Sequence, residues 1–102
     1  MSIVVVATLI PKPGRLQDVI DGFEAVNPLV HDEQGCELYA AHTDGERVVM
    51  VERWTTEADL DAHATGAPIR ELHRLHGDAV ESVEVLRLEN LPFGQPDKAT
   101  IQ

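Results

Sequence analysis

A carboxylate, an indole and an imidazole are spaced in this sequence so that they could act together on one substrate. Glu52 and Trp54 are two residues apart in a segment rich in β-branched residues, so their side chains share one face of a predicted strand. His63 follows on a short predicted helix that must fold back over this strand. A carboxylate beside an imidazole can hold it as a base near neutral pH, and a tryptophan offers a flat wall for an aromatic ligand. His63, Glu52 and Trp54 are therefore the candidate catalytic residues.

The same cluster has a structural explanation. Glu52 could simply pair with His63 or with an arginine, and Trp54 could simply belong to the core. Ion-pair networks of this kind also perturb pKa values. Composition alone favours this structural interpretation, so the catalytic hypothesis needs further support.

Other polar residues are less informative. Tyr39 lies on a predicted strand over 36–42 and could line a pocket or pack in a dimer interface. His73 and His76 are three residues apart on a predicted helix and could share a metal, but no third ligand is fixed by the spacing. We therefore predict no metal site and place both on a solvated helix face. Cys36 is expected to be a small buried residue and not a reactive thiol.

Composition excludes several classes of function. The chain has 102 residues, 43% of them hydrophobic, and a formal net charge of −10. That charge argues against binding to nucleic acid or to an anionic membrane surface. The longest apolar run is too short to span a bilayer, and no basic segment precedes it. We expect a soluble cytoplasmic protein.

Several cofactor and nucleophile motifs are absent from the sequence. It contains no Gly-x-Gly-x-x-Gly, no Gly-x-x-x-x-Gly-Lys and no Gly-x-Ser-x-Gly. A single cysteine rules out an internal disulfide and gives no support to Cys-based zinc or iron–sulfur sites. The sequence therefore contains none of the usual motifs for binding a dinucleotide or a nucleoside triphosphate, or for the nucleophile of the common hydrolases.

Periodicity and turn signals predict the order β-α-β-β-α-β. The predicted strands cover residues 3–10, 36–42, 47–54 and 79–90, and the helices cover 14–33, a stretch ending near 64 and a stretch from 68 to 77. This order is typical of the ferredoxin-like α+β fold, with one antiparallel sheet. We expect one domain over 1–90 and a C-terminal tail over 91–102.

The first and third strands are apolar on both faces. Val4 and Val6 oppose Val5 and Ala7 on the first strand, whereas a sheet covered on one face should alternate. Helices can cover only one of these faces. The other face needs a partner, and we predict a homodimer with its sheets packed face to face.

Taken together, these segments resemble the antibiotic biosynthesis monooxygenase family over about residues 3–90. The matching segments are Val6-Ala7, Lys12-Pro13-Gly14, Glu33-Gln34-Gly35-Cys36, Tyr39, Val49-Met50-Val51-Glu52-Arg53-Trp54 and Leu60-Asp61-Ala62-His63. The second half is most similar to the quinol monooxygenases of this family. The resemblance implies a dimeric α+β barrel and an oxygenase that oxidises phenols, hydroquinones or anthrones to quinones. It implies no cofactor, with molecular oxygen as co-substrate.

The resemblance also implies roles for the candidate residues. His63 would be the base, Glu52 would orient it, and Trp54 would stack on the substrate. Tyr39 would hydrogen-bond an oxygen of the substrate or of a peroxy intermediate. The residues assigned to substrate binding are Tyr39, Met50 and Phe23. Haem-degrading relatives use an asparagine on the first strand, which this sequence lacks, so haem degradation is disfavoured.

Two other functions remain open on the same fold: isomerisation of a small keto compound, and non-catalytic ligand binding by a dimer. An apolar cavity of about 300 Å³ or more beside His63 would favour oxidation of an aromatic molecule. A polar cavity with a buried cation would favour the isomerase, and a filled core would favour the binding module.

Overall fold

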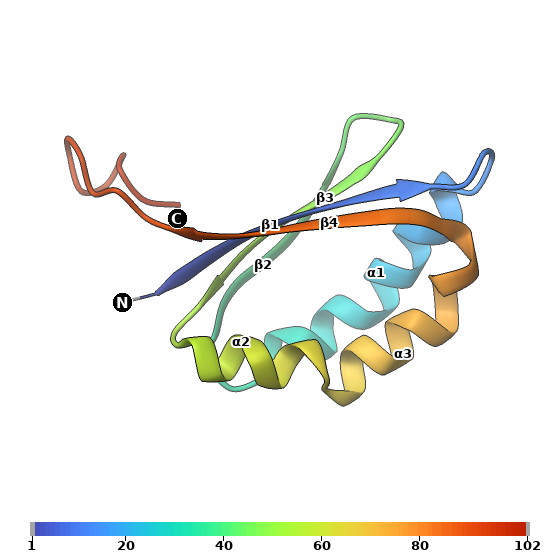
Figure 1. Ribbon diagram of the computed structural model, residues 1–102, viewed down its shortest axis with the longest axis horizontal. Coiled ribbons are helices and arrows are strands. Elements are labelled where there is room, and N and C mark those ends of the chain that lie inside the picture. The colour runs from blue at the N-terminus through green and yellow to red at the C-terminus, as the bar shows by residue number, and fades with distance from the viewer. Residues whose placement is uncertain (1, 102) are drawn as a thin grey trace.

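One four-stranded sheet carries all the helices on one of its faces (Figure 1). The computed structural model describes residues 2–101; Met1 and Gln102, the outermost residues of the predicted domain and tail, lie outside the described residues. The elements are β1 (Ile3–Pro11), α1 (Leu16–His31), β2 (Cys36–Thr43), β3 (Val48–Trp54), α2 (Glu57–Ala64), α3 (Ala67–His76) and β4 (Val80–Glu89). A short 3₁₀ turn, Gly77–Ala79, joins α3 to β4. The predicted order of elements is confirmed.

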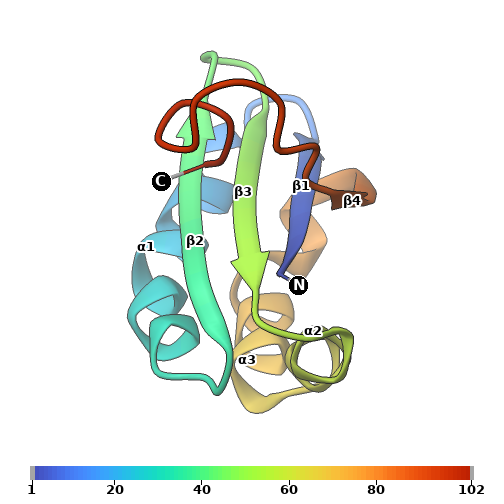
Figure 2. The ribbon, with the colours of Figure 1, turned by 90° about the vertical axis from the view of Figure 1, so that its left-hand side faces the viewer.

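The strands pair in the order β2-β3-β1-β4, and all three pairings are antiparallel. Figure 2 shows these strands side by side, with α1 and α3 behind them and α2 at the lower right. The two β-α-β units thus place β1 and β3 at the centre of the sheet. This is the ferredoxin-like α+β arrangement that the sequence predicts.

The core lies between the sheet and the helices. From β1, Val5, Ala7 and Leu9 point into it, and α1 contributes Val19 and Phe23. On β3, burial alternates along the whole strand, so every second side chain faces the helices. This alternation puts Glu52 and Trp54 in the same layer as the core, as expected from their spacing.

The ends of the helices follow local signals. The first helix is shorter at both ends than the predicted range of 14–33, and residues 32–35 form the turn to β2. Thr56 caps α2, because its Oγ1 accepts the backbone N–H of Asp59 at 3.1 Å. Gly66 separates α2 from α3, and Pro68 occupies the first turn of α3.

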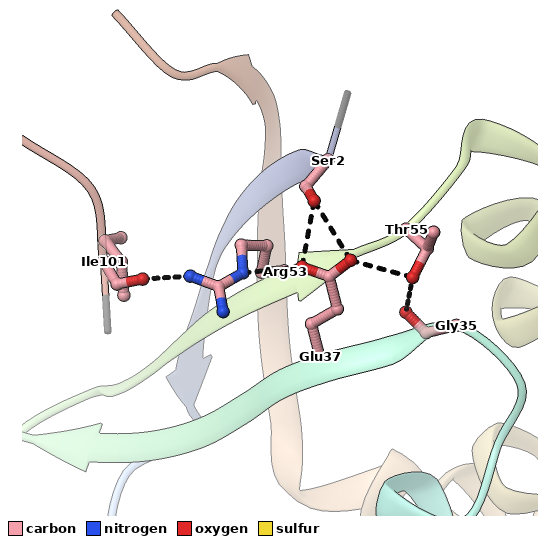
Figure 3. A network of polar contacts seen from close by, with 6 residues as sticks. All are labelled: Ser2, Gly35, Glu37, Arg53, Thr55 and Ile101. Carbon is pink, nitrogen blue, oxygen red and sulfur yellow. Dashed lines mark hydrogen bonds and ion pairs between the residues drawn. The ribbon is translucent and has the colours of Figure 1, made fainter. Parts of the chain in front are cut away.

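The outer face of the sheet is apolar at its centre and polar at one end. Val6 of β1 pairs with Val51 of β3 and with Leu86 of β4 on this face. At the polar end, Arg53 forms an ion pair with Glu37, and it donates a hydrogen bond to the carbonyl of Ile101 in the C-terminal tail (Figure 3). The tail crosses this face in front of the strands (Figure 2).

Across residues 2–101, none of the helices has both the length and the apolar character needed to cross a membrane.

Candidate functional site

A cavity of about 620 Å³ opens between the sheet and the helices α2 and α3. Its walls are mainly apolar, and the apolar residues include Val5, Ala7, Leu9, Phe23, Met50, Leu60, Ile69 and Leu72. The side chains of Val83 and Val85 on the edge strand β4 also line it, and both are more than half exposed. The cavity therefore opens to solvent along β4, while its opposite wall, near Tyr39 and Glu52, is buried.

His63 stands on the wall of this cavity with a carboxylate behind it. Its Nδ1 lies 2.9 Å from Oε1 of Glu33, and only 7% of the His63 side chain is exposed. A carboxylate accepts hydrogen bonds, so Nδ1 carries the proton that it donates to Glu33. In the neutral form of this tautomer, the second ring nitrogen, Nε2, has a free lone pair. This arrangement is that of an imidazole base oriented by a carboxylate.

Gly35 brings this carboxylate to the histidine. Its backbone has φ +80°, and a Cβ at this position would lie 2.2 Å from Oδ2 of Asp59 in α2. A residue without a side chain is therefore required where the α1–β2 turn meets α2. The carbonyl of Gly35 also accepts the backbone N–H of Thr55 at 2.9 Å. These contacts hold Glu33 beside the end of α2 that carries His63.

Glu52 does not orient His63 through a hydrogen bond, contrary to expectation. Its Oε1 accepts the indole Nε1–H of Trp54 at 2.9 Å, and the residue is 5% exposed. Burial raises the pKa of Glu52, and the hydrogen bond from Trp54 opposes this shift only in part. The carboxyl group lies on the cavity wall with its pKa displaced toward neutral pH.

Trp54 lies behind His63 and not against the cavity, which corrects the expectation that it stacks on a substrate. It is completely buried, and its ring centroid is 4.5 Å from that of His63 with an angle of 32° between the planes. The cavity wall does not include it. Trp54 therefore supports the two polar groups: its face packs on the imidazole and its N–H bonds Glu52.

All three residues assigned to substrate binding line the cavity. Tyr39, Met50 and Phe23 come from β2, β3 and α1. Tyr39 packs edge-on against His63, with 5.3 Å between their ring centroids. Burial, followed by the nearby charges of Glu52 and Glu33, raises the pKa of Tyr39, so its hydroxyl remains a hydrogen-bond donor.

The two histidines of α3 differ in burial. His73 is exposed and His76 is 2% exposed, and both line the cavity. The expectation of a shared solvated face is therefore wrong for His76. Within residues 2–101, no group of three or more His, Cys, Asp or Glu side chains is arranged to hold a metal ion. Burial raises the pKa of Cys36, so its thiol stays protonated.

Glu33 is the functional candidate that sequence reasoning missed. The predicted helix ended at this residue, and nothing in the periodicity points it toward His63. Its signal was local: an acid two residues before Gly35, in a turn that must pass close to another helix. The histidine and the carboxylate are 30 residues apart in the chain, so only the fold brings them together.

Comparison with known proteins identifies the family. The sequence pattern of the family described as antibiotic biosynthesis monooxygenase matches residues 2–75. The probable quinol monooxygenase YgiN of Escherichia coli is 33% identical, over 58% of this chain and 69% of that protein. Both matches support a monooxygenase-type function.

Solved structures share the fold. A protein from Pseudomonas aeruginosa superposes with a TM-score of 0.81 at 22% identity, covering 88% of this chain and 94% of that one. A protein from Shewanella oneidensis gives a TM-score of 0.76 at 28% identity, covering 85% and 88%. A structure described as an antibiotic biosynthesis monooxygenase gives a TM-score of 0.80 at 21% identity, covering 88% and 99%. The chain belongs to the antibiotic biosynthesis monooxygenase family.

Proposed function

We propose that this protein is a cofactor-independent monooxygenase that oxidises an electron-rich phenol, hydroquinone or anthrone-like aromatic to a quinone with molecular oxygen. The observation that carries the proposal is His63 on the wall of an apolar cavity, with Nδ1 bonded to Glu33. This geometry leaves Nε2 of His63 free to accept a proton from a bound hydroxyl.

Proton removal is the step that these residues accelerate. Triplet oxygen reacts slowly with closed-shell molecules, and a deprotonated phenol is a much better one-electron donor than a neutral one. Nε2 of His63 takes the hydroxyl proton, and the Glu33 carboxylate stabilises the imidazolium that forms. A bound aromatic substrate displaces water from the apolar cavity and so strengthens this interaction.

The remaining steps belong to the substrate and oxygen. The anion gives one electron to oxygen, and the resulting radical pair joins to form a carbon–oxygen bond. The oxygen–oxygen bond then breaks. In a phenol or an anthrone, one oxygen atom remains on the substrate carbon as a carbonyl, and the other leaves as water with two hydrogens of the substrate. In a hydroquinone, the retained oxygen becomes a ring hydroxyl of the quinone, and the other oxygen again leaves as water. The substrate itself supplies all the electrons, so this chemistry needs no metal or organic cofactor.

Tyr39 and Glu52 are suited to assist at the same end of the cavity. The hydroxyl of Tyr39 remains protonated and can donate a hydrogen bond to an oxygen of the substrate or of the peroxide. Glu52 has a raised pKa, so it can return a proton to the departing oxygen. Trp54 keeps the Glu52 carboxyl group in place.

The cavity favours oxidation of an aromatic molecule over the other two functions. Its volume of about 620 Å³ exceeds what a filled core would leave. Its lining is mainly apolar, and the arginine in it, Arg87, is exposed and paired with Asp61 at 3.0 Å. The buried cation expected for isomerisation of a small keto compound is therefore not found among the described lining residues.

Oxygen uptake tests the proposal. Metal-free protein is mixed with a panel of hydroquinones and anthrones, beside a protein-free blank and the His63→Ala variant. We expect uptake above the blank with the native protein and its loss in the variant, while circular dichroism shows that both are folded. Absence of uptake with every compound would contradict the oxygenase proposal. Uptake that survives in His63→Ala would contradict the assignment of the base.

We also propose that a second copy of the chain covers the outer face of the sheet. Val6 and Val51 lie on this face beside Leu86 and Leu88, which are 46% and 41% exposed. Two such faces related by a two-fold axis would bury each other. Light scattering should give the mass of a dimer, and Leu86→Glu should shift it toward a monomer; a monomeric native protein would contradict this proposal.

The cytoplasmic location stays a prediction of the sequence.

A further inference from the structure

His76 is a second histidine on the cavity wall that the proposed chemistry does not use. It is the last residue of α3 and is 2% exposed. Its Nδ1 lies 3.1 Å from the backbone carbonyl oxygen of Val19, so Nδ1 carries a proton and donates it there. Nε2 then has a lone pair, and none of residues 2–101 gives it a hydrogen bond. Among residues 2–101 the buried side-chain atom without a hydrogen-bond partner is Oδ1 of Asn27, so Nε2 of His76 keeps accessible surface and can bond a molecule in the cavity.

The fold holds this ring in place from two sides. A Cβ on Gly22 would lie 2.5 Å from Nδ1 of His76, so the imidazole occupies the space that a glycine in α1 leaves. Phe23 meets the ring edge-on, with 5.1 Å between the centroids. Burial lowers the pKa of His76, with His73 as the nearby charge that adds to this effect, so the ring is neutral and Nε2 remains an acceptor.

His63 and His76 line the same cavity from different helices. His63 lies near the end of α2, His76 is the last residue of α3, and the ten residues of α3 rise about 15 Å along the axis of that helix. Between them, α3 contributes the apolar side chains of Ile69 and Leu72 to the wall. The cavity therefore has one imidazole from α2 and another from the end of α3, with apolar side chains of α3 between them in the chain.

We infer that the cavity binds an extended aromatic molecule with a hydroxyl group at each end, and that Nε2 of His76 accepts the hydrogen bond of the second hydroxyl. This inference rests on the proposed function for the hydroxyl at His63. His76 is a specificity-determining residue, because a bound molecule without the distal hydroxyl would cover its acceptor without giving it a hydrogen bond.

Anaerobic titration calorimetry tests this inference without turnover. The probes are naphthalene-2,6-diol, which has hydroxyls at opposite ends of a fused ring, and naphthalen-2-ol, which lacks one of them. We expect the native protein to bind the diol about tenfold more tightly, the effect of one well-formed buried hydrogen bond. The same comparison with benzene-1,4-diol and phenol should give a smaller ratio, because a single ring is too short to reach both ends.

Two variants of His76 separate recognition from folding. In His76→Asn the amide nitrogen can still donate to the carbonyl of Val19, but nothing replaces Nε2, so the tenfold preference should fall to about one. In His76→Gln the amide oxygen can reach the position of Nε2, so part of the preference should return. Gly22→Ala should also reduce the preference, because its methyl group displaces the intact imidazole. His42→Asn, the same change at an exposed histidine outside the lining of this cavity, should leave it unchanged.

The binding results test this inference separately from the proposed oxidation. A diol preference that His76→Asn abolishes and His42→Asn keeps supports the inference, even if oxygen uptake is later found to be absent and the proposed oxidation fails. Equal binding of the two naphthalene probes to the native protein would overturn it. So would a preference that His76→Asn retains or that His42→Asn removes, even if the protein consumes oxygen.

Discussion

Two glutamates on neighbouring strands face opposite sides of the sheet, and their environments differ. Glu37 on β2 lies on the outer face, where Oγ of Ser2, Oγ1 of Thr55 and Nε of Arg53 donate hydrogen bonds to it at 2.8–3.0 Å (Figure 3). The hydrogen bond from Thr55 is the largest of the causes that lower its pKa. The ionised form of Glu37 is thus fully partnered, partly exposed and suited to a structural role.

Glu52 on β3 lies on the inner face with far less support for its charge. Among the described residues, Trp54 is its hydrogen-bond donor, and burial is the main cause that raises its pKa. The comparison shows two uses of a carboxylate. One that accepts several hydrogen bonds stays ionised and stabilises the fold, whereas one with a single hydrogen-bond donor beside a cavity can still exchange a proton. The proton chemistry therefore belongs to the inner face, with the Glu33–His63 pair at its centre.

The largest expected loss of activity follows from replacing His63, the proposed catalytic base on the inner face of the sheet. In His63→Asn the amide nitrogen can keep the hydrogen bond to Glu33, but no group can take a proton from the substrate. We expect turnover to fall by about 10²–10⁴-fold, the usual contribution of a general base. Steady-state oxygen uptake measures this, and calorimetric unfolding checks that the melting temperature is nearly preserved. A loss of less than about fivefold would remove His63 from the chemistry.

A smaller loss is expected when the carboxylate behind His63 is neutralised. Glu33→Gln keeps the shape but removes the charge that orients and stabilises the imidazolium, so turnover should fall at least about tenfold, yet less than in His63→Asn. Asp32→Asn, an identical change at the exposed neighbouring residue, should have no effect. In the double variant of Glu33 and His63 the two losses should not add, because the two residues act as one unit. Additive losses would show that Glu33 acts elsewhere.

The pH dependence of unfolding should reveal the raised pKa of Glu52. The folded state holds its proton more tightly than the unfolded chain, whose glutamates titrate near 4.5. This stabilisation is complete below that value and is lost as the pH rises through the folded pKa. Glu52→Gln cannot ionise, yet its amide oxygen can still accept from Trp54. Its unfolding free energy should rise relative to the native protein with increasing pH, by at most about 1.4 kcal/mol per pH unit. Parallel pH profiles of variant and native protein would contradict the raised pKa.

The smallest change is expected when Glu37 is replaced, and its effect on the free energy of unfolding should depend on pH in the opposite direction to that of Glu52. Its folded pKa is lowered, so its stabilisation is present above the unfolded value and is lost as the pH falls through the folded pKa. Glu37→Gln should cost about 0.5–1 kcal/mol at neutral pH in denaturant titrations, a range typical of partly exposed ion pairs. The difference from the native protein should vanish in acid, and oxygen uptake should be unchanged. A loss of uptake would place part of the active site on the outer face.

The fold was predictable from the sequence because its signals are local. The β-branched runs, the amphipathic first helix, Gly66 and the Thr56 cap each act within a few residues, and together they give the order of elements. The alternation along β3 also placed Glu52 and Trp54 on the inner face. The helix bounds differ by about two residues, since capping and turn geometry compete with periodicity at helix ends.

The polar partners in the site were not predictable in the same way. Periodicity gives the face of a side chain but not which of several groups on that face comes within 3 Å of it. Three carboxylate and imidazole partners were therefore misjudged: His63 bonds Glu33, Glu52 bonds Trp54, and His76 is buried against Val19. Each of these contacts depends on the packing of separate elements, which only the three-dimensional structure supplies.

Anaerobic mixing of the metal-free protein with a hydroquinone or an anthrone tests the central claim most directly. The claim is that His63 removes a proton from the bound substrate before oxygen takes part. The account predicts that the absorption band of the substrate anion appears on binding to the native protein at neutral pH, is absent with His63→Asn, and decays when oxygen is admitted. A substrate that remains neutral on the native protein and is nevertheless oxidised when oxygen enters would contradict the account.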